Sequence, residues 1–150
     1  MFKHLLIPTD GSELSEAAAY AGIQLAKEQG AQVTGLYVIP DYAVIYATEG
    51  MLSMNVYGEL EQSAQIAANS SLEFIKQLAQ KESVPCKTVM VTDISTYEAI
   101  IKQAQSNNCD LICMASHGRK GIGSLLLGSE TQKVLSHSHI PVLVHRPALT

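Results

Sequence analysis

The 150-residue chain lacks several features by which protein classes are recognised from sequence. Its three cysteines (Cys86, Cys109 and Cys113) are odd in number and have no CxxC spacing, which argues against a disulfide framework or a zinc knuckle. The 10 Lys and Arg residues against 14 Asp and Glu give a formal charge of −4 without any cationic block. Binding to nucleic acid depends on clustered cations, so we expect no nucleic-acid partner.

Long apolar runs are also missing. The opening segment has only three consecutive apolar residues, Leu5 to Ile7, before Pro8, too few for a secretion signal. No stretch reaches the roughly 18 to 20 apolar residues that a membrane-spanning helix needs. These absences, with the sparse cysteines, favour a cytoplasmic protein without a membrane partner.

Length and composition favour one folded unit. A domain takes on the order of 150 residues, and a chain of this size buries most of the surface that its unfolded form exposes. The 47% of hydrophobic residues supply enough apolar material for one core. We therefore expect a single domain over residues 1–150.

Apolar runs and amphipathic stretches alternate along the chain. The runs typical of strands cover residues 3–8, 33–39, 86–91, 110–115 and 140–145, and the helical patterns cover residues 12–28, 59–81, 95–107 and 128–136. This alternation predicts an α/β fold, an open doubly wound sheet of five parallel strands (βαβαβαβαβ) with right-handed crossovers. Residues 41–58 show no clean period, and we interpret them as a long, partly ordered excursion.

Two loops follow strands at the edge of the sheet where ligands bind in such folds. Residues 9–12 (Thr-Asp-Gly-Ser) follow the first predicted strand, and the glycine-rich residues 116–124 follow the fourth. The second loop leads into a helix, whose N-terminal N–H groups favour an anion. Its glycines would let the backbone approach phosphate oxygens closely. The pattern indicates phosphate binding.

Common phosphate-binding and catalytic motifs do not fit. A P-loop alignment places Ser124 where lysine is required, and a dinucleotide fingerprint places Leu126 where glycine or alanine is required. We find no nucleophile–base pair and no second carboxylate near Asp10. His137 and His139 lack nearby cysteine or carboxylate ligands. We therefore assign no catalytic residue and no metal ligand.

Another spacing does fit. The nucleotide-binding members of the universal stress protein family carry G-x2-G-x9-G-(S/T), and the sequence matches it from Ala115 through Gly118 to Gly128-Ser129, with alanine in place of the first glycine. Residues 8–12 resemble the opening strand and turn of the family, and residues 140–145 resemble its closing strand. The resemblance implies a Rossmann-like sheet of strand order 3-2-1-4-5. It also implies an ATP-binding sensor or regulatory module of the stress response, with at most weak ATPase activity.

The resemblance places an adenine nucleotide over the first and fourth strands, with Mg²⁺ or Mn²⁺ as an optional companion of ATP. Asp10 would contact the ribose or base, and the backbone of Val38 would bind adenine. Gly118, Gly128 and Ser129 would surround the phosphates. The full expected binding set is Pro8, Thr9, Asp10, Val38, Met114, Ala115, Gly118, Gly128, Ser129 and Thr131. The Cβ of Ala115 could crowd the ribose or a phosphate.

Plainer interpretations stay open. Asp10 could cap the first helix or its turn, and Ser129 could be a helix N-cap with Gln132 at capping-box spacing. The chain could also be a dimeric interaction protein of the same fold that has lost the nucleotide site, or, less favoured, a slow ATP hydrolase. The strand predicted at Ile140 to His145 would lie at a sheet edge. In the family it pairs across a two-fold axis, which implies a homodimer.

Overall fold

Five parallel strands form one sheet in the order β3-β2-β1-β4-β5, which confirms the predicted fold class and strand order. The computed structural model describes residues 1–49, 54–118 and 126–148. The strands are β1 (His4–Pro8), β2 (Gln32–Pro40), β3 (Cys86–Asp93), β4 (Leu111–Ala115) and β5 (Val142–His145).

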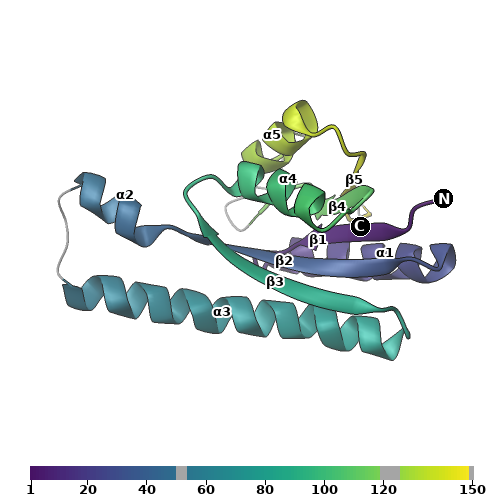
Figure 1. The fold of residues 1–150 in the computed structure, drawn as a ribbon, viewed down its shortest axis with the longest axis horizontal. Coiled ribbons are helices and arrows are strands. Elements are labelled where there is room, and N and C mark those ends of the chain that lie inside the picture. Colours follow the sequence, from purple (N-terminus) through teal and green to yellow (C-terminus); the bar gives the residue numbers. More distant parts are fainter. Residues whose placement is uncertain (50–53, 119–125, 149–150) are drawn as a thin grey trace.

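Helices cover both faces of the sheet. They are α1 (Glu13–Gln29), α2 (Tyr42–Glu49), α3 (Met54–Lys81), α4 (Thr96–Ser106) and α5 (Ser129–His137). Figure 1 shows α1 and α3 on one face and α4 and α5 on the other. In the same view α2 and the beginning of α3 extend past the carboxyl end of β2.

The central strands β1, β2 and β4 bury their side chains on both faces of the sheet. Ile7 of β1 packs in one cluster with Ile23 of α1 and Ile75 of α3. Its neighbour Leu6 packs in the opposite cluster with Val134 of α5. All five side chains are fully buried, and burial of each such side chain stabilises the fold by about 1.5–3 kcal/mol. Burial on both faces explains why these strands read as continuous apolar runs.

Local signals define both ends of α1. The hydroxyl of Ser12 accepts a hydrogen bond from the backbone N–H of Ser15 at 3.2 Å, which makes it the N-cap. Gly30 ends the helix in the left-handed conformation with φ 64°. Glycine adopts this conformation without the steric cost that a Cβ imposes.

The expectation of a partly ordered excursion over residues 41–58 is wrong for most of that segment. It holds α2 and the beginning of α3, which starts at Met54 instead of residue 59, while residues 50–53 lie outside the described part. At the start of α2, Asp41 Oδ1 accepts the N–H of Val44 at 3.3 Å. The rings of Tyr42 and Tyr46, one turn apart, stack with centroids 6.1 Å apart. The apolar residues of α2 are distributed around its whole circumference and do not form one stripe, so its sequence shows no helical period.

Candidate functional site

The ends of the central strands form a step. β1 ends at Pro8, opposite Leu36, whereas β2 continues to Pro40 with β3 beside it. The carbonyl of Leu36 accepts the N–H of Thr9 at 2.8 Å, so it points toward β1. Backbone groups in a strand repeat their direction every second residue. The N–H and C=O of Val38 therefore face the same side, beyond the last residue of β1.

The turn after β1 is fixed by its own side chains. Asp10 Oδ1 accepts the N–H of Ser12 at 2.9 Å. Thr9 Oγ1 accepts the N–H of Gly11 at 3.1 Å and lies 3.0 Å from Ser15 Oγ. Gly11 has φ 80°, which glycine adopts readily. The interpretation of Asp10 as a turn residue therefore holds for one carboxylate oxygen.

The other oxygen of Asp10 faces the loop that follows β4. A Cβ built on Gly118 would lie 2.8 Å from Asp10 Oδ2, closer than real Cβ contacts. Glycine at position 118 thus permits the carboxylate to approach the backbone. This contact joins the ends of β1 and β4, the two strands between which the winding of the sheet reverses.

The beginning of α5 is tied to the end of β4. The N–H of Gly128 donates to the carbonyl of Ser116 at 2.8 Å, and the hydroxyl of Thr131 donates to the carbonyl of Ala115 at 2.9 Å. Gly128 is the N-cap, so the alternative of Ser129 as N-cap is wrong. The Ser129 side chain is exposed in the first turn. The N-terminal end of α5, with its partial positive charge, therefore lies directly beside the end of β4.

His117 is a buried residue of this loop that the sequence analysis did not assign. Its side chain is 8% exposed, and its Nδ1 lies 3.1 Å from Ser116 Oγ. Among the residues that the structure describes, Nε2 has no hydrogen-bond partner. The adjoining Cδ2 lies 3.7 Å from a Cβ position on Gly128, so this edge of the ring faces the start of α5. A polar Ser-His pair directly after an entirely apolar strand was the signal that could have identified it.

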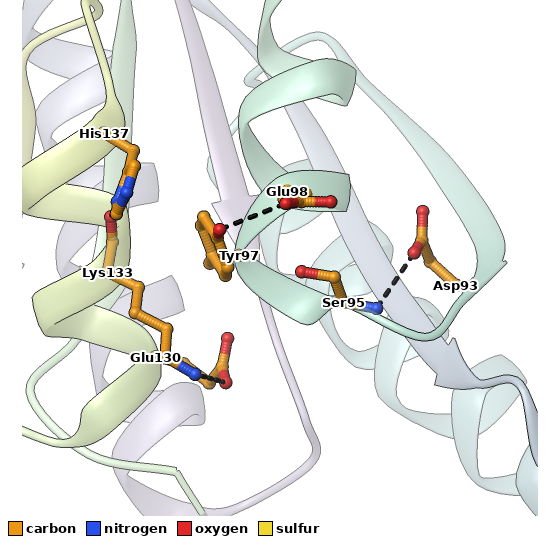
Figure 2. Close-up of polar contacts among 7 residues, drawn as sticks. All are labelled: Asp93, Ser95, Tyr97, Glu98, Glu130, Lys133 and His137. Carbon is orange, nitrogen blue, oxygen red and sulfur yellow. Dashed lines mark hydrogen bonds and ion pairs between the residues drawn. The ribbon is translucent and has the colours of Figure 1, made fainter. Parts of the chain in front are cut away.

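Figure 2 shows how α5 is held against α4. The ring of Tyr97 lies 5.0 Å from that of His137, and Lys133 Nζ lies 5.7 Å from the Tyr97 centroid. Lys133 also forms an ion pair with Glu130 at 3.5 Å, and the Tyr97 hydroxyl donates to Glu98 at 3.1 Å. The cluster fixes the position of α5, and with it the helix end at the site.

The ten expected binding residues all lie at or near this edge but differ in what they present. Asp10, Val38, Gly118 and Ser129 are partly or fully exposed there. Gly128 has no side chain to present. The side chains of the other five residues are buried. They are Pro8, Thr9, Met114, Ala115 and Thr131, and they can contribute chiefly through the main chain. Residues 119–125 of the glycine-rich loop lie outside the described part.

Other kinds of site find no support among the described residues. Within residues 1–49, 54–118 and 126–148, no group of three or more His, Cys, Asp or Glu could hold a metal ion. Burial raises the pKa of Cys109 and Cys113 to about 11. Their thiols are therefore protonated at neutral pH and pack as small apolar groups. In the same described ranges no helix has the length and apolar character to cross a membrane.

Comparison with known proteins identifies relatives over nearly the whole chain. The universal stress protein family model matches residues 1–146. Universal stress protein MJ0531 of Methanocaldococcus jannaschii is 33% identical over 144 residues, covering 96% of this chain and 82% of that protein. The solved structure of MJ0577 from the same organism superposes with a TM-score of 0.82 at 30% identity, covering 100% of this chain and 99% of that one. A universal stress protein of Archaeoglobus fulgidus in complex with dAMP has the same fold, with a TM-score of 0.66 at 15% identity over 97% of this chain and 98% of that one.

Proposed function

Because the chain belongs to the universal stress protein family, we propose that it binds an adenine nucleotide, with ATP as the principal ligand, and acts as a regulatory module of the stress response. The proposed site lies over the ends of β1 and β4. The Archaeoglobus fulgidus relative in complex with dAMP supports this ligand class.

The main chain of Val38 carries the proposal. It offers one N–H and one C=O side by side at the step beyond β1, since the pairing partner of β2 on that side ends at Pro8. Adenine presents an exocyclic N–H₂ donor where guanine presents a carbonyl acceptor. The carbonyl of Val38 would therefore accept from adenine and repel guanine. This geometry supports a preference for adenine nucleotides.

The neighbouring groups suit the rest of a nucleotide. Asp10 provides a carboxylate that can accept hydrogen bonds from ribose hydroxyls. The N-terminus of α5, with the exposed hydroxyl of Ser129, favours phosphate oxygens. His117 Nε2 is buried and has no partner within residues 1–49, 54–118 and 126–148, and it supplies one more polar atom beside that helix end. A Mg²⁺ or Mn²⁺ ion accompanying ATP would find the Asp10 carboxylate and the phosphates as oxygen ligands.

Titration calorimetry tests the proposal directly. We expect ATP, ADP and dAMP to bind. GTP should bind at least about tenfold more weakly, because the carbonyl oxygen of Val38 would lie opposite the carbonyl oxygen of guanine and both are acceptors. Asp10→Asn should weaken ATP binding, and Glu13→Gln, an exposed change one helical turn away, should not. Equal affinity for ATP and GTP would refute the role of Val38. Absence of binding to any of these nucleotides would favour the interaction-protein alternative.

We also propose a homodimer formed through β5. Pro141 and His145 direct their carbonyls to β4, so the backbone groups of Val142 and Val144 face the open edge. Leu143 is 37% exposed on this four-residue strand. Unpaired edge groups with apolar side chains favour pairing with a second copy.

Sedimentation at micromolar concentration tests the dimer. Val142→Pro removes an outward N–H, and Val144→Lys introduces a charge, so each should shift the protein toward monomer. Leu135→Lys, on an exposed position of α5, serves as the control and should leave the dimer intact. A parent protein that is monomeric, or a Val142→Pro variant that remains dimeric, would contradict the proposed interface.

A further inference from the structure

An arm extends from the body of the protein next to the carboxyl end of β2. We define the arm as α2 together with residues 54–67 of α3 (Figure 1). Ala68 and Leu72 of α3 pack with Tyr37 and Ile39 of β2. Tyr42 and Ala64, at the root of the arm, also pack against this cluster. In α2, none of residues 42–48 is buried. The arm therefore has a large surface in proportion to the contacts that hold it.

Apolar side chains of the arm are open to solvent. Val44 is 47% exposed, Val56 50% and Ile66 63%. A single exposed apolar residue is ordinary on a protein surface. Several on one projecting element, two of them within α2 and the first turn of α3, indicate a surface that another chain covers.

The charge of this region is of one sign. No Lys, Arg or His occurs from residue 28 to residue 75, a stretch that holds six of the 14 acidic residues. All 10 Lys and Arg residues lie outside it. Among the described residues, the two ion pairs, Lys27 with Glu82 and Lys133 with Glu130, are also outside the arm. The arm carboxylates of Glu59 and Glu61, with Asp41 at its root, thus lack cationic partners within the described chain.

A small pocket lies at the root of the arm. Its cavity measures about 20 Å³, which is room for one water molecule or one ammonium group. Its lining includes Asp41, Tyr42, Tyr57 and Glu61. A hydrogen bond to Glu61 raises the pKa of the Tyr57 hydroxyl. Carboxylates and aromatic faces together are the groups that bind an ammonium ion.

We propose that the arm docks a cationic amphipathic helix of a partner protein and that a lysine of this helix places its ammonium group in the pocket. Apolar residues of the same helix would cover Val44 and Val56. The planar guanidinium of arginine is larger than the cavity, so lysine is the preferred cation. Pairing of two arms from two copies would bring like charges together, which argues against self-association through this surface. The proposal does not depend on nucleotide binding.

A labelled helical peptide of leucine, alanine and lysine is the probe, titrated with the full-length protein and followed by fluorescence anisotropy. We expect the lysine peptide to bind, its arginine counterpart to bind more weakly, and its glutamine counterpart not to bind. The double variant Glu59→Gln, Glu61→Gln should weaken binding of the lysine peptide by roughly fivefold or more. Glu73→Gln makes the same chemical change on α3 outside the arm and should have no effect.

A second variant tests the apolar part of the surface. Val44→Ser with Val56→Ser should also weaken the lysine peptide, while circular dichroism confirms that the helices remain. Equal binding of the lysine and glutamine peptides, or unchanged binding to both double variants, would overturn the proposal. Equal binding of the arginine peptide would overturn the assignment of the pocket. Self-association that Glu59→Gln, Glu61→Gln abolishes would identify a second copy as the occupant and would also overturn it.

Discussion

Replacement of Gly118 by alanine tests whether the close approach of Asp10 to Gly118, at the ends of β1 and β4, serves nucleotide binding or folding. The new Cβ would lie 2.8 Å from Asp10 Oδ2, so the carboxylate must move. That oxygen is the end of a side chain that can rotate, and Gly118 is itself exposed. The backbone at position 118 does not have a positive φ, so alanine adds no conformational strain there.

The cost to stability should be small and the cost to binding larger. Rotation of Asp10 would disturb its 2.9 Å hydrogen bond from the Ser12 N–H. Such a bond contributes about 0.5–1.5 kcal/mol, equivalent to a decrease in Tm of a few degrees for a chain of this length. If Asp10 binds the ribose, displacement of its charge removes about 1.5–3 kcal/mol of binding free energy. The Kd for ATP should then rise by roughly tenfold to a hundredfold.

Gly128→Ala is the matched comparison. Its Cβ would lie 3.2 Å from both His117 Cα and Ser116 O, which are backbone atoms that cannot rotate away. We expect it to lower the free energy of unfolding by about 1–3 kcal/mol. Thermal denaturation and calorimetry with ATP, made on both variants, distinguish the two effects. A Tm for Gly118→Ala as low as that of Gly128→Ala, or wild-type affinity of Gly118→Ala for ATP, would refute the reasoning.

Two further predictions concern stability. Burial, with a smaller effect of Lys87, lowers the pKa of His4 from 6.5 in the folded state. As the pH falls through 6.5, the unfolded chain therefore binds a proton at His4 before the folded chain does. The free energy of unfolding should decrease from about pH 6.5 down to the lower folded pKa. Urea denaturation between about pH 7 and pH 5 should show this decrease in the parent and a flatter profile in His4→Gln; identical profiles would contradict it. Gly30→Ala should lower the free energy of unfolding by about 1–2 kcal/mol, because residue 30 has φ 64° with no atom within 4 Å of the added Cβ, and Gly30→Asn should lower it less. Equal urea midpoints for the parent and the alanine variant would show that the conformation is not strained.

The strands and α1 could be predicted because their signals are local. Continuous apolar runs that end at Pro8 and Pro40 specify buried strands, and Ser12 and Gly30 specify the ends of α1. The helix α2 could not be predicted in this way. Its apolar residues do not form one stripe, because it packs lightly on α3 and leaves Val44 exposed. A helix that buries little of its surface lacks the period from which sequence analysis infers helices.

The location of the site could be predicted from the sequence, but the directions in which its side chains point could not. A spacing of glycines identifies the loop, but it does not say which side chains point inward. Met114 packs among core residues and Thr131 bonds to the carbonyl of Ala115, and neither arrangement follows from the motif. His117 went unassigned because the spacing pattern treats it as a variable position. The ATP ligand, the homodimer, the single domain and the cytoplasmic location stay predictions.

The continuity of β2 has a thermodynamic consequence. Val38 at the proposed nucleotide site and Asp41 at the root of the arm are three residues apart on one chain, and the N–H of Asp41 is bonded to the carbonyl of Asp93 at 3.2 Å. A ligand that shifts the backbone at Val38 would also change the conformations available to Asp41, and a partner bound at the arm would do the same to Val38. Such linkage is reciprocal: by whatever factor a nucleotide changes the affinity of the arm for its partner, the partner must change the affinity for the nucleotide by the same factor.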